Sequence, residues 1–67
     1  MPKINDVIRA LEIFRDADAG EVWIEAGHDE LYGPSEREAN LNDEQRVELD
    51  SLGWHLSSEY DCWMAST

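Results

Sequence analysis

Hydrophobic residues recur at intervals of three and four near the start of the chain, at Ile4, Val7, Ile8, Leu11 and Phe14. This period places them on one side of an α-helix, which we expect over residues 5 to 17. Ala10 and Ile13 widen its apolar face. Asn5 is the expected N-cap, and Gly20 is expected to end the segment in a left-handed conformation.

The next segment changes to a period of two, which is typical of a β-strand. An apolar series alternates with a series of acids and one aromatic: Val22, Ile24 and Ala26 against Glu21, Trp23 and Glu25. We therefore expect a strand over residues 21 to 26, a turn over 27 to 29 and a short return strand over 30 to 33. Residues 34 to 40 are expected to form a polar loop.

A second helix is predicted over residues 43 to 52. Asn42 and Gln45 have the spacing of a capping box, and Leu41 can pack back on the helix as a hydrophobic staple. Its inner face is expected to consist of Val47, Leu49 and Leu52. Gly53 is the expected left-handed residue after the helix, and Trp54 would then supply the hydrophobic contact of that ending.

Two further strands are predicted over residues 54 to 56 and 61 to 65, with a turn over 57 to 60. The order is α-β-β-α-β-β, and the expected fold class is α+β: one domain over residues 1 to 67, with a four-stranded antiparallel sheet and two helices on one face. Some of the aromatic residues would then lie on the opposite sheet face: Trp23, Tyr32, His55 and Trp63. Either they cover that face, or it is a contact surface.

The chain has 67 residues, with 16 acids, 5 lysines and arginines and a formal net charge of −11. This charge argues against binding of nucleic acid or of an anionic membrane. It favours either a soluble protein that repels other copies of itself or one with a strongly basic partner. Three tryptophans and 42% hydrophobic residues indicate a folded chain. A single cysteine and the lack of a long apolar run lead us to expect a cytoplasmic, monomeric protein without disulfides.

Three kinds of chemical site were weighed, and none matches well. A calcium loop beginning at Asp16 would put Gly20 at position 5 and Gly27 at position 12, where the loop needs an oxygen ligand and a glutamate. His55 and Cys62 could face each other across a hairpin, but the acidic surroundings raise the expected thiol pKa and oppose a reactive thiolate. Carboxylate catalysis needs a pocket that so small a chain has little room to form. We expect no enzyme activity, no metal site and no cofactor.

The location of the charge is more informative than its total. Residues 21 to 53 contain ten acids and two arginines, a net charge of −8, whereas residues 1 to 20 have a net charge of −1. An acidic array of this density can imitate the phosphates of DNA. Trp23 or Tyr32 would give it an apolar anchor at its edge. The acids expected to bind the partner are Glu25, Asp29, Glu30, Glu36, Glu38, Asp43, Glu44 and Glu48.

The segment from Leu49 to Trp63, LDSLGWHLSSEYDCW, resembles the end of small acidic proteins of phages and mobile elements. In those proteins a helix ends in Leu-Gly-Trp, and a hairpin with an acidic turn and a final aromatic follows. Residues 28 to 32, HDELY, are similar to the middle of the same proteins. Some members are anti-CRISPR proteins. The matching residues are mostly structural, so no site residues are carried over.

For the members that act as DNA mimics, the resemblance implies binding to the basic DNA-recognition surface of a type I CRISPR surveillance complex. Together with the charge map, it leads us to expect a non-enzymatic inhibitor of a bacterial defence complex. The alternative is an antitoxin-like or regulatory module that binds a basic protein through its aromatic sheet face. Salt separates the two, because mimicry predicts a steep loss of affinity at high ionic strength.

Overall fold

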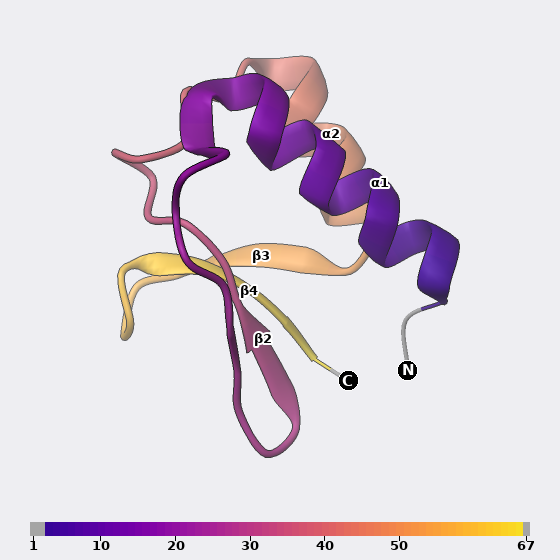
Figure 1. Ribbon diagram of the computed structural model, residues 1–67, viewed down its shortest axis with the longest axis vertical. Helices are drawn as coiled ribbons and strands as arrows, with labels where there is room; N and C mark the ends of the chain where they lie inside the picture. The colour runs from indigo at the N-terminus through magenta and orange to yellow at the C-terminus, as the bar shows by residue number, and fades with distance from the viewer. Residues whose placement is uncertain (1–2, 67) are drawn as a thin grey trace.

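The computed structural model describes residues 3 to 66, which form two layers (Figure 1). The predicted class and element order are confirmed. The elements are α1 (Ile4–Phe14), the wide helical turn η1 (Arg15–Ala19), β1 (Glu25–Ala26), β2 (Glu30–Tyr32), α2 (Asp43–Ser51), β3 (Trp54–Ser57) and β4 (Cys62–Ser66).

The four strands form one antiparallel sheet in the order β1-β2-β4-β3. The two hairpins therefore join through β2 and β4, with Tyr32 opposite Met64 and Leu31 opposite Ala65. Because successive side chains in a strand point to opposite faces, each register row belongs to one face. The row through Leu31, Ala65 and Trp54 faces the helices. The next row, through Tyr32, Met64 and His55, lies on the opposite, outer face, where Met64 is nevertheless buried.

The core lies between the helices and the inner sheet face, and aromatic rings fill its centre. Trp54 is 1% exposed, and its ring meets that of Phe14 edge to face at a centroid distance of 5.1 Å. Trp63 lies beside them with 5% exposure, so it belongs to the core and not to the outer face. Gly33 permits this packing, because a Cβ there would lie 3.2 Å from the Trp54 ring. Two of the three tryptophans thus stabilise the fold.

The first helix is confirmed, but its start and its buried side differ from the prediction. Lys3 occupies the N-cap position without a side-chain hydrogen bond, and Asn5 lies inside the helix. Ala10 and Ile13 are buried, whereas Ile4 is 79% exposed. Residues on both sides of this helix are apolar, so periodicity could not identify the buried side. The neighbouring α2 and the sheet select it.

The connection after α1 also differs from the prediction. Gly20 has a right-handed φ of −67°, and Asp18 adopts the left-handed conformation instead, at φ 68°. The predicted strand over residues 21 to 26 is reduced to Glu25–Ala26. Val22 packs against the core from an irregular segment, because the chain is still descending from the helix layer to the sheet there.

The second helix has the predicted ends. Asn42 Oδ1 accepts a hydrogen bond from the Gln45 amide at 2.8 Å, and Gln45 Oε1 accepts one from the Asn42 amide at 2.9 Å, which completes the capping box. Gly53 has a φ of +92°, as expected after the helix. Val47 is 70% exposed, so its predicted place on the inner face is wrong. In this nine-residue helix only Leu49 is buried, because only one side of a short helix reaches the core.

Candidate functional site

Each of the four arginines has a carboxylate partner. Arg9 binds Glu48 through two hydrogen bonds, Nε to Oε2 at 2.6 Å and Nη2 to Oε1 at 3.0 Å, and so joins α1 to α2. The other pairs are Arg15 with Asp16 at 3.5 Å, Arg37 with Asp61 at 3.2 Å and Arg46 with Glu36 at 3.1 Å. No arginine among residues 3 to 66 is therefore left to offset the remaining acids.

Three of the eight predicted site acids have partners within the chain. Glu36 and Glu48 form ion pairs with Arg46 and Arg9. Glu38 accepts a hydrogen bond from the Ser35 amide at 2.8 Å and so orders the loop before α2. The other five predicted site acids have no salt bridge or side-chain hydrogen bond within residues 3 to 66: Glu25, Asp29, Glu30, Asp43 and Glu44.

The five unpaired site acids fall into two groups. Glu25, Asp29 and Glu30 lie in the β1–β2 hairpin, which extends away from the helices (Figure 1). Asp43 and Glu44 lie in the first turn of α2, within the helix layer. The positive end of the helix dipole stabilises both of these carboxylates. Both groups belong to the acidic stretch of residues 21 to 53, but the fold places them on different layers.

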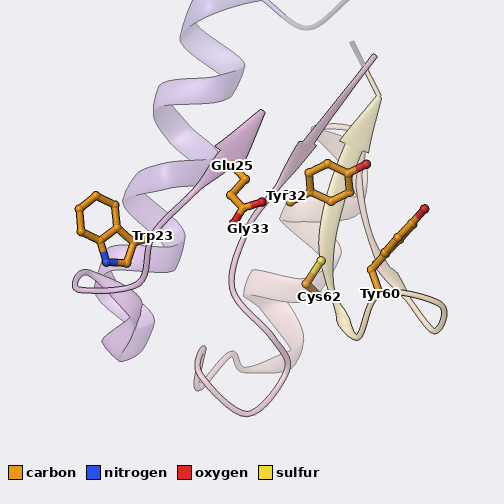
Figure 2. Close-up of a pocket in the computed structure, with 6 residues that line it drawn as sticks. All are labelled: Trp23, Glu25, Tyr32, Gly33, Tyr60 and Cys62. Carbon is orange, nitrogen blue, oxygen red and sulfur yellow. The ribbon is translucent and has the colours of Figure 1, made fainter. Parts of the chain in front are cut away.

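A groove crosses the outer sheet face beside the hairpin acids (Figure 2). It has a volume of about 360 Å³ and is lined by Trp23, Glu25, Tyr32, Gly33, Tyr60 and Cys62. Trp23 is 90% exposed. The rings of Tyr32 and Tyr60 pack edge to face at 5.6 Å. Trp23 and Tyr32 are the anchors predicted from the sequence, whereas Tyr60, which reaches the groove from the turn before β4, is not marked by any local pattern.

The surroundings of the groove favour the neutral forms of Tyr32 and Cys62. Burial raises the pKa of Tyr32, and the nearby Glu30 and Tyr60 raise it further. Burial also raises the pKa of the Cys62 thiol, with Asp61 and Glu25 adding to the effect. The raised thiol pKa agrees with the sequence-based expectation. Glu25 is therefore the one carboxylate that lines the groove with a negative charge.

His55 and Cys62, the candidates for a thiol site, lie on adjacent strands but not directly opposite each other. His55 lies opposite Met64, and Cys62 lies opposite Ser57, so the histidine and the thiol are two positions apart on adjacent strands. Within residues 3 to 66, no three His, Cys, Asp or Glu side chains are grouped so as to hold a metal ion. The groove can instead bind a group that stacks on aromatic rings and pairs with a carboxylate.

No helix within residues 3 to 66 has the length and apolar character needed to cross a bilayer. Comparison of the chain with protein-family models, with curated proteins and with solved structures found no match.

Proposed function

We propose that the protein is a non-enzymatic inhibitor that acts in the bacterial cytoplasm by occupying the basic DNA-recognition surface of a defence complex. Residues 49–63 and 28–32 resemble small acidic phage proteins, some of which are anti-CRISPR proteins, and this resemblance suggests a type I CRISPR effector as the target. The observation that carries the proposal is the state of the arginines: each is paired with an acid of the same chain. The excess negative charge is therefore available to a partner.

The amount of charge suits a mimic of duplex DNA. Duplex DNA carries one charge for about each 1.7 Å of its axis. A segment as long as the largest extent of this protein, 27 Å, therefore carries about 16 charges. The protein's net charge over that length is −11, about two thirds as much. A groove lined by lysine and arginine would therefore meet a charge of the same order on either.

The two groups of acids give the proposal a direct test. One variant reverses Asp29 and Glu30 to lysine, a second reverses Asp43 and Glu44, and a control reverses the exposed acids Asp50 and Glu59. All three variants have the same change in charge. We expect each of the first two to lose about tenfold or more in affinity for a purified type I CRISPR surveillance complex, and the control to lose much less.

Salt provides the second measurement. The affinity of the unmodified protein is expected to fall steeply as salt rises, since screening weakens charge pairing at a distance. Equal losses in all three variants would mean that only the total charge matters and would contradict a site at these acids. Tight binding by a variant with all four site acids replaced would overturn the mimicry.

A second candidate function rests on the exposed Trp23 beside the groove. Trp23 is 90% exposed, and aromatic residues are enriched in protein interfaces. This alternative is an antitoxin-like or regulatory module that binds a basic protein mainly through the outer sheet face. It predicts a shallow salt dependence and a large loss of affinity on Trp23→Ala.

A further inference from the structure

We infer that the groove on the outer sheet face is a binding site for one arginine side chain of the basic partner. This inference rests on the proposed function and adds a specific contact to it. The acidic side chains attract a basic surface as a whole. The groove would recognise one residue of that surface.

The aromatic side chains supply the stacking surfaces of this site. Tyr32 and Tyr60 hold each other edge to face, with their rings 5.6 Å apart, so their positions are mutually fixed. The Tyr32 ring also covers Gly27, where an added Cβ would lie 2.8 Å from its Cε2. Trp23 lies at the other side of the groove and keeps most of its indole in water (Figure 2). A guanidinium plane is attracted to such ring faces.

Glu25 supplies the charge. It lies opposite Tyr32 in the register and on the same sheet face. Figure 2 shows its carboxylate between the Trp23 and Tyr32 side chains. An arginine in the groove can donate two parallel N–H···O bonds to this carboxylate while its plane rests on an aromatic ring. The neutral forms of Tyr32 and Cys62 leave no competing anion in the lining.

The chain does not fill the groove with a cation of its own. All four arginines bind carboxylates elsewhere, and neither arginine nor lysine lines the groove within the described part of the chain. Its volume of about 360 Å³ exceeds what one guanidinium occupies, so the aliphatic stem of the side chain can enter as well. Charge complementarity therefore indicates an arginine from outside.

The test uses the full chain and two small probes. N-acetyl-arginine amide is the ligand, and N-acetyl-citrulline amide, which has nearly the same shape but no charge, is the control. Trp23 reports binding by fluorescence, because Trp54 and Trp63 are only 1% and 5% exposed. We expect weak, saturable binding of the arginine probe, with NMR shifts centred on Glu25, Tyr32 and Tyr60, and binding of the citrulline probe about tenfold weaker.

Two substitutions locate the site. Glu25→Gln removes the charge and should weaken binding of the arginine probe about threefold to fivefold. Trp23→Leu keeps an apolar side chain but removes the ring face and should weaken binding by a similar factor; this variant lacks the fluorescent reporter, so its binding is measured by the NMR shifts of Glu25, Tyr32 and Tyr60. Glu44→Gln, in α2, removes the same charge as Glu25→Gln away from the groove and should leave binding within about 1.5-fold, allowing only for long-range screening. Circular dichroism of each variant checks that it is folded.

Binding assays on the defence complex separate this inference from the proposed function. If Glu25→Gln and Trp23→Leu leave affinity for the complex unchanged while reversal of Asp43 and Glu44 abolishes it, the groove inference is overturned and the mimicry stands. If the arginine probe binds in the groove but the protein does not bind the complex, the groove inference stands and the target is wrong. Equal binding of arginine and citrulline probes overturns the groove inference directly.

Discussion

Two glycines that the sequence presents alike should respond to the same substitution in opposite directions. Gly20 and Gly53 each follow a helical segment, and both match the pattern of a left-handed helix ending. In the structure only Gly53 is left-handed, with a φ of +92°, whereas Gly20 has a φ of −67°. Replacement of each by alanine therefore tests the backbone conformation and little else.

The expected magnitudes follow from the surroundings of each position. No atom lies within 4 Å of a Cβ added at Gly53, so the cost of Gly53→Ala is conformational. A left-handed L-residue costs about 1–2 kcal/mol, and the less flexible unfolded chain returns about 0.4–1 kcal/mol. We expect a net loss of about 1 kcal/mol. At Gly20 the new Cβ would lie 3.4 Å from Arg15 Cγ, an ordinary contact, so Gly20→Ala should stabilise by about 0.5 kcal/mol.

The assay is urea and thermal unfolding followed by circular dichroism. For a domain of this size, 1 kcal/mol corresponds to about 4–8 °C in Tm. Gly53→Ala should lower the Tm by about that amount and Gly20→Ala should raise it by about half as much, with the same urea dependence in both. A lower Tm for Gly20→Ala, or shifts in the same direction for both variants, would refute the conformations assigned to these residues.

Three more predictions concern named contacts. The hydrogen bonds from Arg9 lower the pKa of Glu48 from 4.5. The pair therefore stabilises the fold above about pH 4.5 and loses this effect as the pH falls through the folded-state pKa. The difference in urea midpoint between the unmodified protein and Glu48→Gln should shrink in acid. Asn42→Ala removes the acceptor for the Gln45 amide and should cost about 1 kcal/mol in urea unfolding, whereas an unchanged midpoint would contradict a capping role. The raised pKa of Cys62 should make its alkylation by iodoacetamide slower at neutral pH than that of a free thiol, and a rate equal to or above the free-thiol rate would contradict it.

The contacts within the chain show which acids of the surface are available to a partner. A composition with −11 suggests one continuous array, but Glu36, Glu38 and Glu48 stabilise loops and helix contacts within the chain. Of the eight predicted site acids, the five that remain for a partner lie at the hairpin and at the start of α2. An inhibitor of this design would contact its target with two groups of carboxylates, and the groove beside the hairpin adds a directional contact to one of them.

Local spacing predicted the parts of the fold that depend on a few neighbouring residues. The helix over Asp43–Ser51, its capping box and the left-handed Gly53 involve partners no more than a few positions apart. Helix and strand periods differ enough to give the element order. The acids were visible in the composition. The short turns between successive strands predicted the pairing within each hairpin.

Only the tertiary structure decided which side of each element is buried. Ile4 and Ile13 are equally apolar, but the positions of α2 and the sheet bury Ile13 and leave Ile4 exposed. The pairing of β2 with β4 brings Tyr32 and Tyr60 together from residues 28 positions apart, which no local pattern encodes. The partners of the arginines have the same origin: Arg9 meets Glu48 across 39 positions because the two helices pack against each other. Spacing along the chain sets what each segment can become, and packing between segments sets which of its side chains are free to act.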